Sequence, residues 1–148
     1  MSCAIDVNIL LYASDRESAF SPGAQEFLSQ LASRRELICV AWSTLMAYLR
    51  ISTHSSVFAR PLTPDEAMNN VEALLRLPHL RVITEEEGFW KVYREITRDV
   101  PARGNLVSDA HLAALLRQHG IDHIYTNDRD FRKFDFLKVR NPFERIQE

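Results

Sequence analysis

Short apolar runs of strand length alternate with segments of helical spacing along the chain, and this alternation limits the folds open to it. The run ELICVAW at 36–42 is apolar almost throughout, as expected for a parallel strand that is covered on both faces. Shorter runs lie at 3–5, 80–84 and 121–126, and FLKVRNP at 136–142 supplies a last short strand. The pattern predicts an α/β fold with a parallel β-sheet flanked by helices on both faces.

Local signals mark several helix ends. Thr63 is a natural N-cap, followed by Pro64 at the first helical position and by Glu66 three residues after the cap, which is the signature of a capping box. Ser43 is predicted to cap the helix that follows the 36–42 strand. Gly120 is predicted to stand just past the end of a later helix, where glycine is favoured.

Composition indicates one globular domain over residues 1–148. The chain is 46% hydrophobic and 26% charged, with a formal net charge of −2, which argues against a strongly basic nucleic-acid binder but allows an RNA-processing enzyme with a local basic rim. Cys3 and Cys39 have no partners at metal-ligand spacing, as is typical of reduced thiols in the cytoplasm. No apolar run approaches the roughly 18 residues of a membrane span. We expect a cytoplasmic protein without membrane contact.

Acidic side chains follow the ends of predicted strands. Asp6 comes directly after the first strand and Asp128 after the strand at 121–126, while Asp109 lies near the start of a helix. Each one alone is explained by a helix cap or a turn. Because ligands of open parallel sheets gather outside the carboxyl ends of the strands, we expect the three side chains to share a pocket.

Such a cluster needs neutralisation. Two carboxylates about 4 Å apart repel by roughly 4 kcal/mol at an effective dielectric constant near 20. A hard cation with oxygen ligands, Mg²⁺ or Mn²⁺, relieves this repulsion. An ion held there can activate water for phosphodiester hydrolysis.

Four segments of the chain resemble the motifs of one family, in that family's order. They are DVNILLYA at 6–13, WSTLMAYLRI at 42–51, SDAHLAALLRQHG at 108–120 and TNDRDF at 126–131. Together they resemble the PIN-domain family, and within it the VapC-type toxin ribonucleases of bacterial toxin–antitoxin systems. The resemblance implies a three-layer PIN-like fold, an acidic site that binds Mg²⁺ or Mn²⁺, and endonucleolytic cleavage of RNA.

The motif positions identify candidate residues. Asp6, Asp109 and Asp128 match the family's first, third and fourth acids, which are catalytic and bind the metal. Polar positions that support this cluster correspond to Asn8, Thr126 and the neighbouring Asp130.

The family's second acid is missing. Where the family usually has a glutamate in the helix after the second strand, this chain has Ala47, and alanine neither binds a metal nor orients a water. Either this lineage has lost part of its site or the glutamate was removed deliberately. We therefore expect a weakened or silenced nuclease on the scaffold of an active one, and the alternative is a non-catalytic module that binds RNA or protein.

Arginines and aromatic residues offer further candidates. Arg103 and Arg129 adjoin the motif acids, so we predict that they contact RNA, whereas the other arginines, Arg50 among them, are expected on solvated faces. Phe89, Trp90 and Tyr93 have helical spacing and are expected in the core rather than as a platform for stacked bases.

Partners follow from the resemblance. The family implies a homodimer and a small cognate antitoxin whose C-terminal segment brings a basic side chain to the acids. We expect an apolar groove lined by Leu45, Tyr48 and Phe58 to accept the rest of that segment as a helix.

Overall fold

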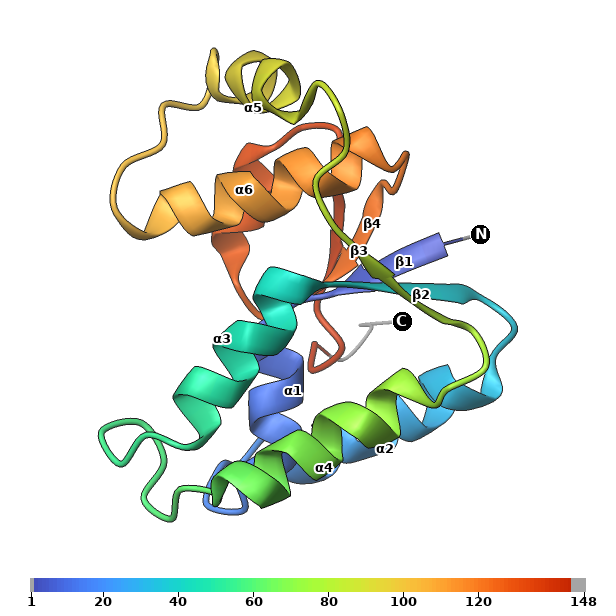
Figure 1. Cartoon of the computed structure of the whole chain (residues 1–148), viewed down its shortest axis with the longest axis vertical. Helices are drawn as coiled ribbons and strands as arrows, with labels where there is room; N and C mark the ends of the chain where they lie inside the picture. Colours follow the sequence, from blue (N-terminus) through green and yellow to red (C-terminus); the bar gives the residue numbers. More distant parts are fainter. Residues whose placement is uncertain (1, 145–148) are drawn as a thin grey trace.

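The computed structural model, which describes residues 2–144, contains a five-stranded sheet in which all neighbouring strands are parallel (Figure 1). The strands are β1 (Ser2–Ile5), β2 (Leu37–Ala41), β3 (Leu80–Ile83), β4 (His123–Tyr125) and β5 (Lys138–Arg140). Their order is β3-β2-β1-β4-β5. The chain extends the sheet from β1 first to one side and then to the other. Ligands of open α/β sheets bind where the order reverses in this way, here between β1 and β4.

Helices cover both faces of the sheet, and the predicted α/β fold is confirmed (Figure 1). One face carries the helices α1 (Val7–Ser14), α2 (Ser21–Ser33), α3 (Trp42–Ser52) and α4 (Pro64–Leu75). The other face carries α5 (Phe89–Thr97), α6 (Asn105–Gln118) and a short 3₁₀ helix, η1 (Arg129–Lys133).

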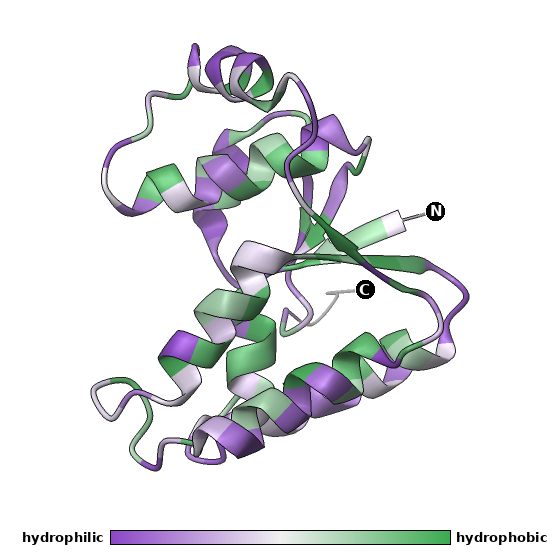
Figure 2. Ribbon diagram, in the orientation of Figure 1, coloured by the Kyte–Doolittle hydropathy of each residue, from purple (hydrophilic) through white to green (hydrophobic). Residues whose placement is uncertain are grey.

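The core consists of two clusters, one on each side of the sheet. Leu115 and Leu116 of α6 pack with Phe131 of η1 in the first cluster, and burial of each such side chain stabilises the fold by about 1.5–3 kcal/mol. Cys39 belongs to this cluster, whereas Cys3 is buried in the cluster on the opposite face. Strand β2 is coloured as hydrophobic along its length, while α4 alternates between hydrophobic and hydrophilic turns (Figure 2).

Two of the predicted helix ends are confirmed and one is wrong. The Thr63 hydroxyl accepts a hydrogen bond from the Glu66 amide at 3.2 Å, and Gly120 follows α6 with a φ of +70° that glycine adopts without strain. Ser43 is not a cap. Helix α3 starts one residue earlier, with Ala41 at the end of β2 as its N-cap, so Ser43 lies inside the first turn.

The prediction that Trp90 is buried is also wrong. Phe89 and Tyr93 pack against the core from α5, but the Trp90 side chain is 67% exposed. One residue corresponds to a rotation of about 100° around a helix, which turns Trp90 away from the face that Phe89 and Tyr93 share. Its ring stacks on Tyr93 with centroids 5.6 Å apart. Among the helices of the described residues, none is both long and apolar enough to cross a membrane.

Candidate active site

Asp6 links the central strand to the first helix. It follows β1 and caps α1, and its Oδ1 accepts a hydrogen bond from the Val7 amide at 2.7 Å. Its Oδ2 accepts a second bond from the Thr126 hydroxyl, also at 2.7 Å. The side chain is 8% exposed, so both carboxylate oxygens are held in fixed positions at the carboxyl end of β1.

Thr126 connects three parts of the site. It follows β4, is 1% exposed, and donates its hydroxyl hydrogen to Asp6. The same oxygen accepts hydrogen bonds from Asn8 Nδ2 at 3.1 Å and from the Asp128 amide at 3.0 Å. One hydroxyl therefore fixes the position of Asp6 relative to the turn that carries Asp128.

Asp109, Asp128 and Asp130 present carboxylate oxygens that all lie within 4.8 Å of one another. Asp128 caps η1 by accepting a hydrogen bond from the Asp130 amide at 2.9 Å. Asp109 reaches the group from the second turn of α6. Ligand oxygens lie about 2.1 Å from Mg²⁺, so opposite ligands are separated by about twice that distance. The spacing and the all-oxygen donor set suit a hard divalent cation together with its waters.

Burial and mutual repulsion shape the titration of these acids. Desolvation, together with the charges of Asp128, Asp6 and Asp130, raises the pKa of Asp109 to about 6, against the opposing effect of Lys133. Burial also raises the pKa of Asp6, although the hydrogen bonds from Thr126 and the Val7 amide oppose the shift. The site therefore accumulates negative charge that a cation would relieve.

A pocket of about 440 Å³ opens beside these acids, between α3 and α6. Asp6, Asp109 and Ala47 all line it. Position 47 therefore stands in the wall of the same pocket as two of the predicted catalytic acids. The remaining lining residues are Val7, Ser43, Thr44, Met46, Arg50, Ser108, His111, Leu112 and Phe131.

Two residues of this pocket were not among the predicted site residues. Arg50 lines it, and the available signal was its spacing of three residues from Ala47, which places both on one helix face. His111 also lines the pocket. Its Nε2 lies 2.5 Å from Glu85 Oε1, and its ring makes a T-shaped contact with Phe89. The hydrogen bond from His111 is the main cause that lowers the pKa of Glu85 to about 2.

The two arginines singled out from the sequence do not line this pocket, although Arg129 lies between Asp128 and Asp130 in the sequence. Arg103 and Arg129 are exposed, and neither is among the residues that line the pocket. A role for them in RNA binding stays a prediction.

Comparison with known proteins matches the chain to the PIN domain over residues 3–137. Ribonuclease VapC48 of Mycobacterium tuberculosis is 42% identical over 143 residues, which cover 97% of this chain and 99% of the relative. Ribonuclease VapC43 of the same species is 32% identical, with 95% of each chain covered.

Solved structures share the fold at low sequence identity. The VapBC2 structure from Rickettsia felis, bound to a DNA fragment from its promoter, matches with a TM-score of 0.69 at 17% identity, over 95% of this chain and 98% of that one. Mycobacterium tuberculosis VapC20, a toxin that cleaves the sarcin-ricin loop, matches with a TM-score of 0.65 at 20% identity, over 94% and 99%.

The chain therefore belongs to the PIN-domain family. Within that family, relatives that match along nearly their whole length are VapC ribonucleases. The chain is accordingly a VapC-type PIN toxin, as its motifs predicted.

Proposed function

We propose that this chain is the toxin of a VapBC-type toxin–antitoxin system and that it cleaves RNA endonucleolytically with Mg²⁺, or Mn²⁺ in its place, at the acidic pocket. The observation that carries the proposal is the group of carboxylates from Asp109, Asp128 and Asp130, within 4.8 Å of one another at the point where the strand order reverses. RNA as substrate agrees with a cytoplasmic location.

Each residue has a distinct part in this proposal. Asp109, Asp128 and Asp130 would supply the oxygens that hold the ion, whose chemistry when bound would be to activate water and to offset charge on the leaving oxygen. Asp6, held at both oxygens, presents a fixed carboxylate beside them. Thr126 positions Asp6 and the Asp128 turn relative to each other, as hydrogen-bonded neighbours of metal ligands commonly do.

Ala47 weakens the site in this proposal. The methyl group lines the pocket with Asp6 and Asp109, but it provides no oxygen to orient water. The chain therefore works with a reduced carboxylate set and cleaves slowly.

Cleavage of single-stranded RNA by the purified chain, with Mn²⁺ or with EDTA, tests the proposal. We expect slow cleavage that needs the metal, faster cleavage by Ala47→Glu, and loss of that gain when Asp109→Asn is added. If Ala47→Glu binds RNA but cuts none of a broad cellular panel, the nuclease proposal is wrong and the non-catalytic RNA-binding module takes its place.

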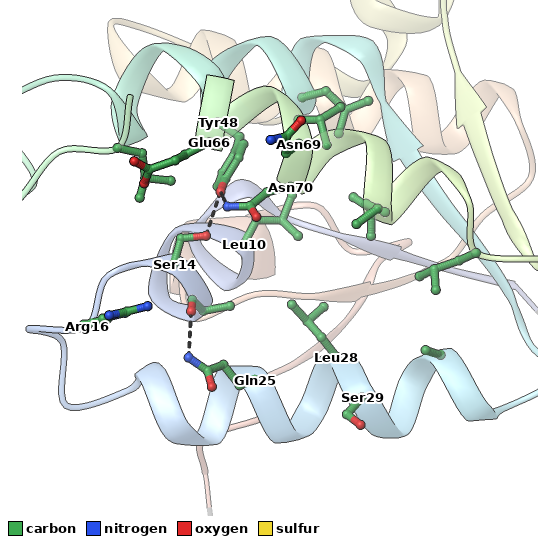
Figure 3. A pocket seen from close by; sticks show the side chains of 18 residues that line it. Leu10, Ser14, Arg16, Gln25, Leu28, Ser29, Tyr48, Glu66, Asn69 and Asn70 are labelled. Carbon is green, nitrogen blue, oxygen red and sulfur yellow. Dashed lines mark hydrogen bonds between the residues drawn. The ribbon is translucent and has the colours of Figure 1, made fainter. Parts of the chain in front are cut away.

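A second cavity supports an antitoxin partner. A groove of about 690 Å³ is lined by residues of α1, α2, α3 and α4 (Figure 3). Leu10 and Leu28 are among its apolar lining residues, as are the predicted residues Leu45 and Tyr48, both of which are buried at the floor of the groove. Phe58 is 2% exposed and is not among the lining residues. An amphipathic helix fits an apolar groove of this kind.

Hydrogen bonds fix the polar points of this groove. The Tyr48 hydroxyl lies 2.6 Å from Ser14 Oγ and accepts a bond from Asn70 Nδ2 at 2.9 Å (Figure 3). Helix α3 contributes Tyr48 to the groove and Ala47 to the acidic pocket. A segment bound in the groove therefore lies one helix away from the acids, where an arginine or lysine can pair with carboxylates in place of the ion.

Co-expression with the small antitoxin encoded beside the toxin, followed by size-exclusion chromatography, tests this partner. We expect one complex, built on a toxin homodimer, that Leu28→Arg disrupts. Val57→Arg is the matched control, because Val57 is an exposed apolar residue outside the groove. Separate elution of the two wild-type chains at low salt would overturn the antitoxin proposal.

A further inference from the structure

Arg50 is a cation in the wall of an acidic pocket. It lies in the last turn of α3 and lines the pocket together with Asp6, Ala47 and Asp109. Ala47 and Arg50 are three residues apart, so they share one face of the helix. That face therefore brings a positive charge to the place where the family's glutamate is missing.

The charge of Arg50 is available to a ligand. Among residues 2–144, no carboxylate oxygen lies within 4.0 Å of its guanidinium nitrogens. Lys133, the nearby lysine that lowers the pKa of Asp109, is instead paired with Asp130 at 3.3 Å. Lys133 is thus already engaged with an acid, whereas Arg50 is not.

A positively charged side chain such as that of Arg50 favours binding of an anionic substrate in an acidic pocket. A phosphodiester that approaches Asp6 and Asp109 meets their negative charge, and a hard cation neutralises only part of it. A guanidinium has a planar set of donors that matches two phosphate oxygens at once. The pocket, at about 440 Å³, is within the size range of small-ligand sites.

We propose that Arg50 binds a backbone phosphate of the RNA strand in the pocket and so positions that strand beside the acids. This inference rests on the proposed ribonuclease function. It assigns to α3 a contact with the substrate.

RNA binding without cleavage tests the inference. Fluorescence anisotropy of a labelled single-stranded RNA is measured in EDTA for the wild type, Arg50→Ala and Arg50→Lys. Arg94→Ala is the matched control, because Arg94 is an exposed arginine in the last turn of α5 and lines neither cavity. Loss of a charge-assisted hydrogen bond predicts binding weaker by about 10- to 100-fold for Arg50→Ala, an intermediate loss for Arg50→Lys, and little change for Arg94→Ala.

Two further readouts separate this role from structural damage. The slope of log affinity against log salt falls by about 0.7 in Arg50→Ala if one phosphate contact to a single strand is lost. The affinity for Mn²⁺ is unchanged or higher, because a nearby positive charge is removed. Equal losses in Arg50→Ala and Arg94→Ala, or wild-type affinity in Arg50→Ala, would overturn the inference while RNA cleavage still stands. A wild type that neither binds nor cleaves RNA would overturn the proposed function and the inference with it.

Discussion

The hydroxyl of Thr126 is the single group whose removal tests the site most sharply. Thr126→Val keeps the shape of this buried side chain but removes its hydrogen bond to Asp6 and its acceptor for Asn8 Nδ2 and the Asp128 amide. We expect the variant to fold, to be less stable, and to bind divalent cations more weakly.

The size of the effect follows from these bonds. A hydrogen bond to a charged group contributes about 1.5–3 kcal/mol to stability. Asn8 Nδ2 and the Asp128 amide lose their acceptor in the variant, and this lowers the stability further unless water binds to them. The total is about 2–4 kcal/mol, which for a chain of this length lowers the melting temperature by roughly 5–12 °C. Loss of a group that orients a metal ligand typically weakens metal binding about 10- to 100-fold.

Thermal unfolding and Mn²⁺ titration measure the two effects. Thr126→Ser is a control that keeps the hydroxyl and loses only a methyl group, so its affinity for Mn²⁺ is expected to stay near that of the wild type. Thr97→Val is a second control, because the Thr97 hydroxyl donates to the neutral Tyr93 carbonyl in α5 and Thr97 lines neither cavity. It is expected to cost about 1 kcal/mol or less and to leave metal binding unchanged.

A Thr126→Val variant that melts within about 2 °C of the wild type and binds Mn²⁺ equally well would show that the prediction is wrong. It would mean that Asp6 and Asp128 hold their positions without the shared hydroxyl.

Three further predictions concern charge in the pocket. The pKa of Asp109 is raised from 3.8 to about 6, so between these pH values the folded metal-free protein holds a proton that the unfolded chain has released. The stability of the metal-free protein therefore falls as pH rises from about 4 to 6, and its affinity for Mn²⁺ rises. Thermal melts and Mn²⁺ titrations at several pH values measure the two effects. Asp109→Asn removes the repulsion between Asp109 and the neighbouring carboxylates. It is expected to stabilise the metal-free protein at pH 7 by about 1 kcal/mol after solvent screening, which raises the melting temperature by a few degrees, and to weaken Mn²⁺ binding. Ala47→Glu adds a carboxylate and is expected to do the reverse, with lower melting temperature in EDTA and a larger Mn²⁺-induced increase.

The sequence indicates that Asp6 and Asp128 follow strand ends, because that placement depends on local rules, whereas the close group of Asp109, Asp128 and Asp130, which does not include Asp6, was not predicted. Asp6 and Asp128 each follow a buried apolar strand, and parallel strands bring their carboxyl ends to one edge. Thr63 and Gly120 were likewise recognisable, since caps depend on a few neighbouring residues.

Features set by tertiary packing were not predictable in the same way. The burial of Trp90 depends on which side of α5 faces α6, and the starting residue of α3 depends on how the chain leaves β2. Asp130 was recognised only as a neighbour of the cluster, because its distance to Asp109 is set by the docking of η1 on α6. Arg50 is exposed, as expected of an arginine on a solvated face, but its sequence does not show that this face borders a pocket whose opposite wall is α6.

The binding of Mn²⁺, followed by electron paramagnetic resonance as the free-ion signal decreases, tests the metal site most directly. The titration compares the wild type with Asp109→Asn at pH 7.5, above the raised pKa of Asp109. We predict saturable binding to the wild type and a loss of affinity of at least about 10-fold in Asp109→Asn, because a carboxylate of the metal site is removed. Absence of saturable binding to the wild type, or equal affinity in both proteins, would contradict it.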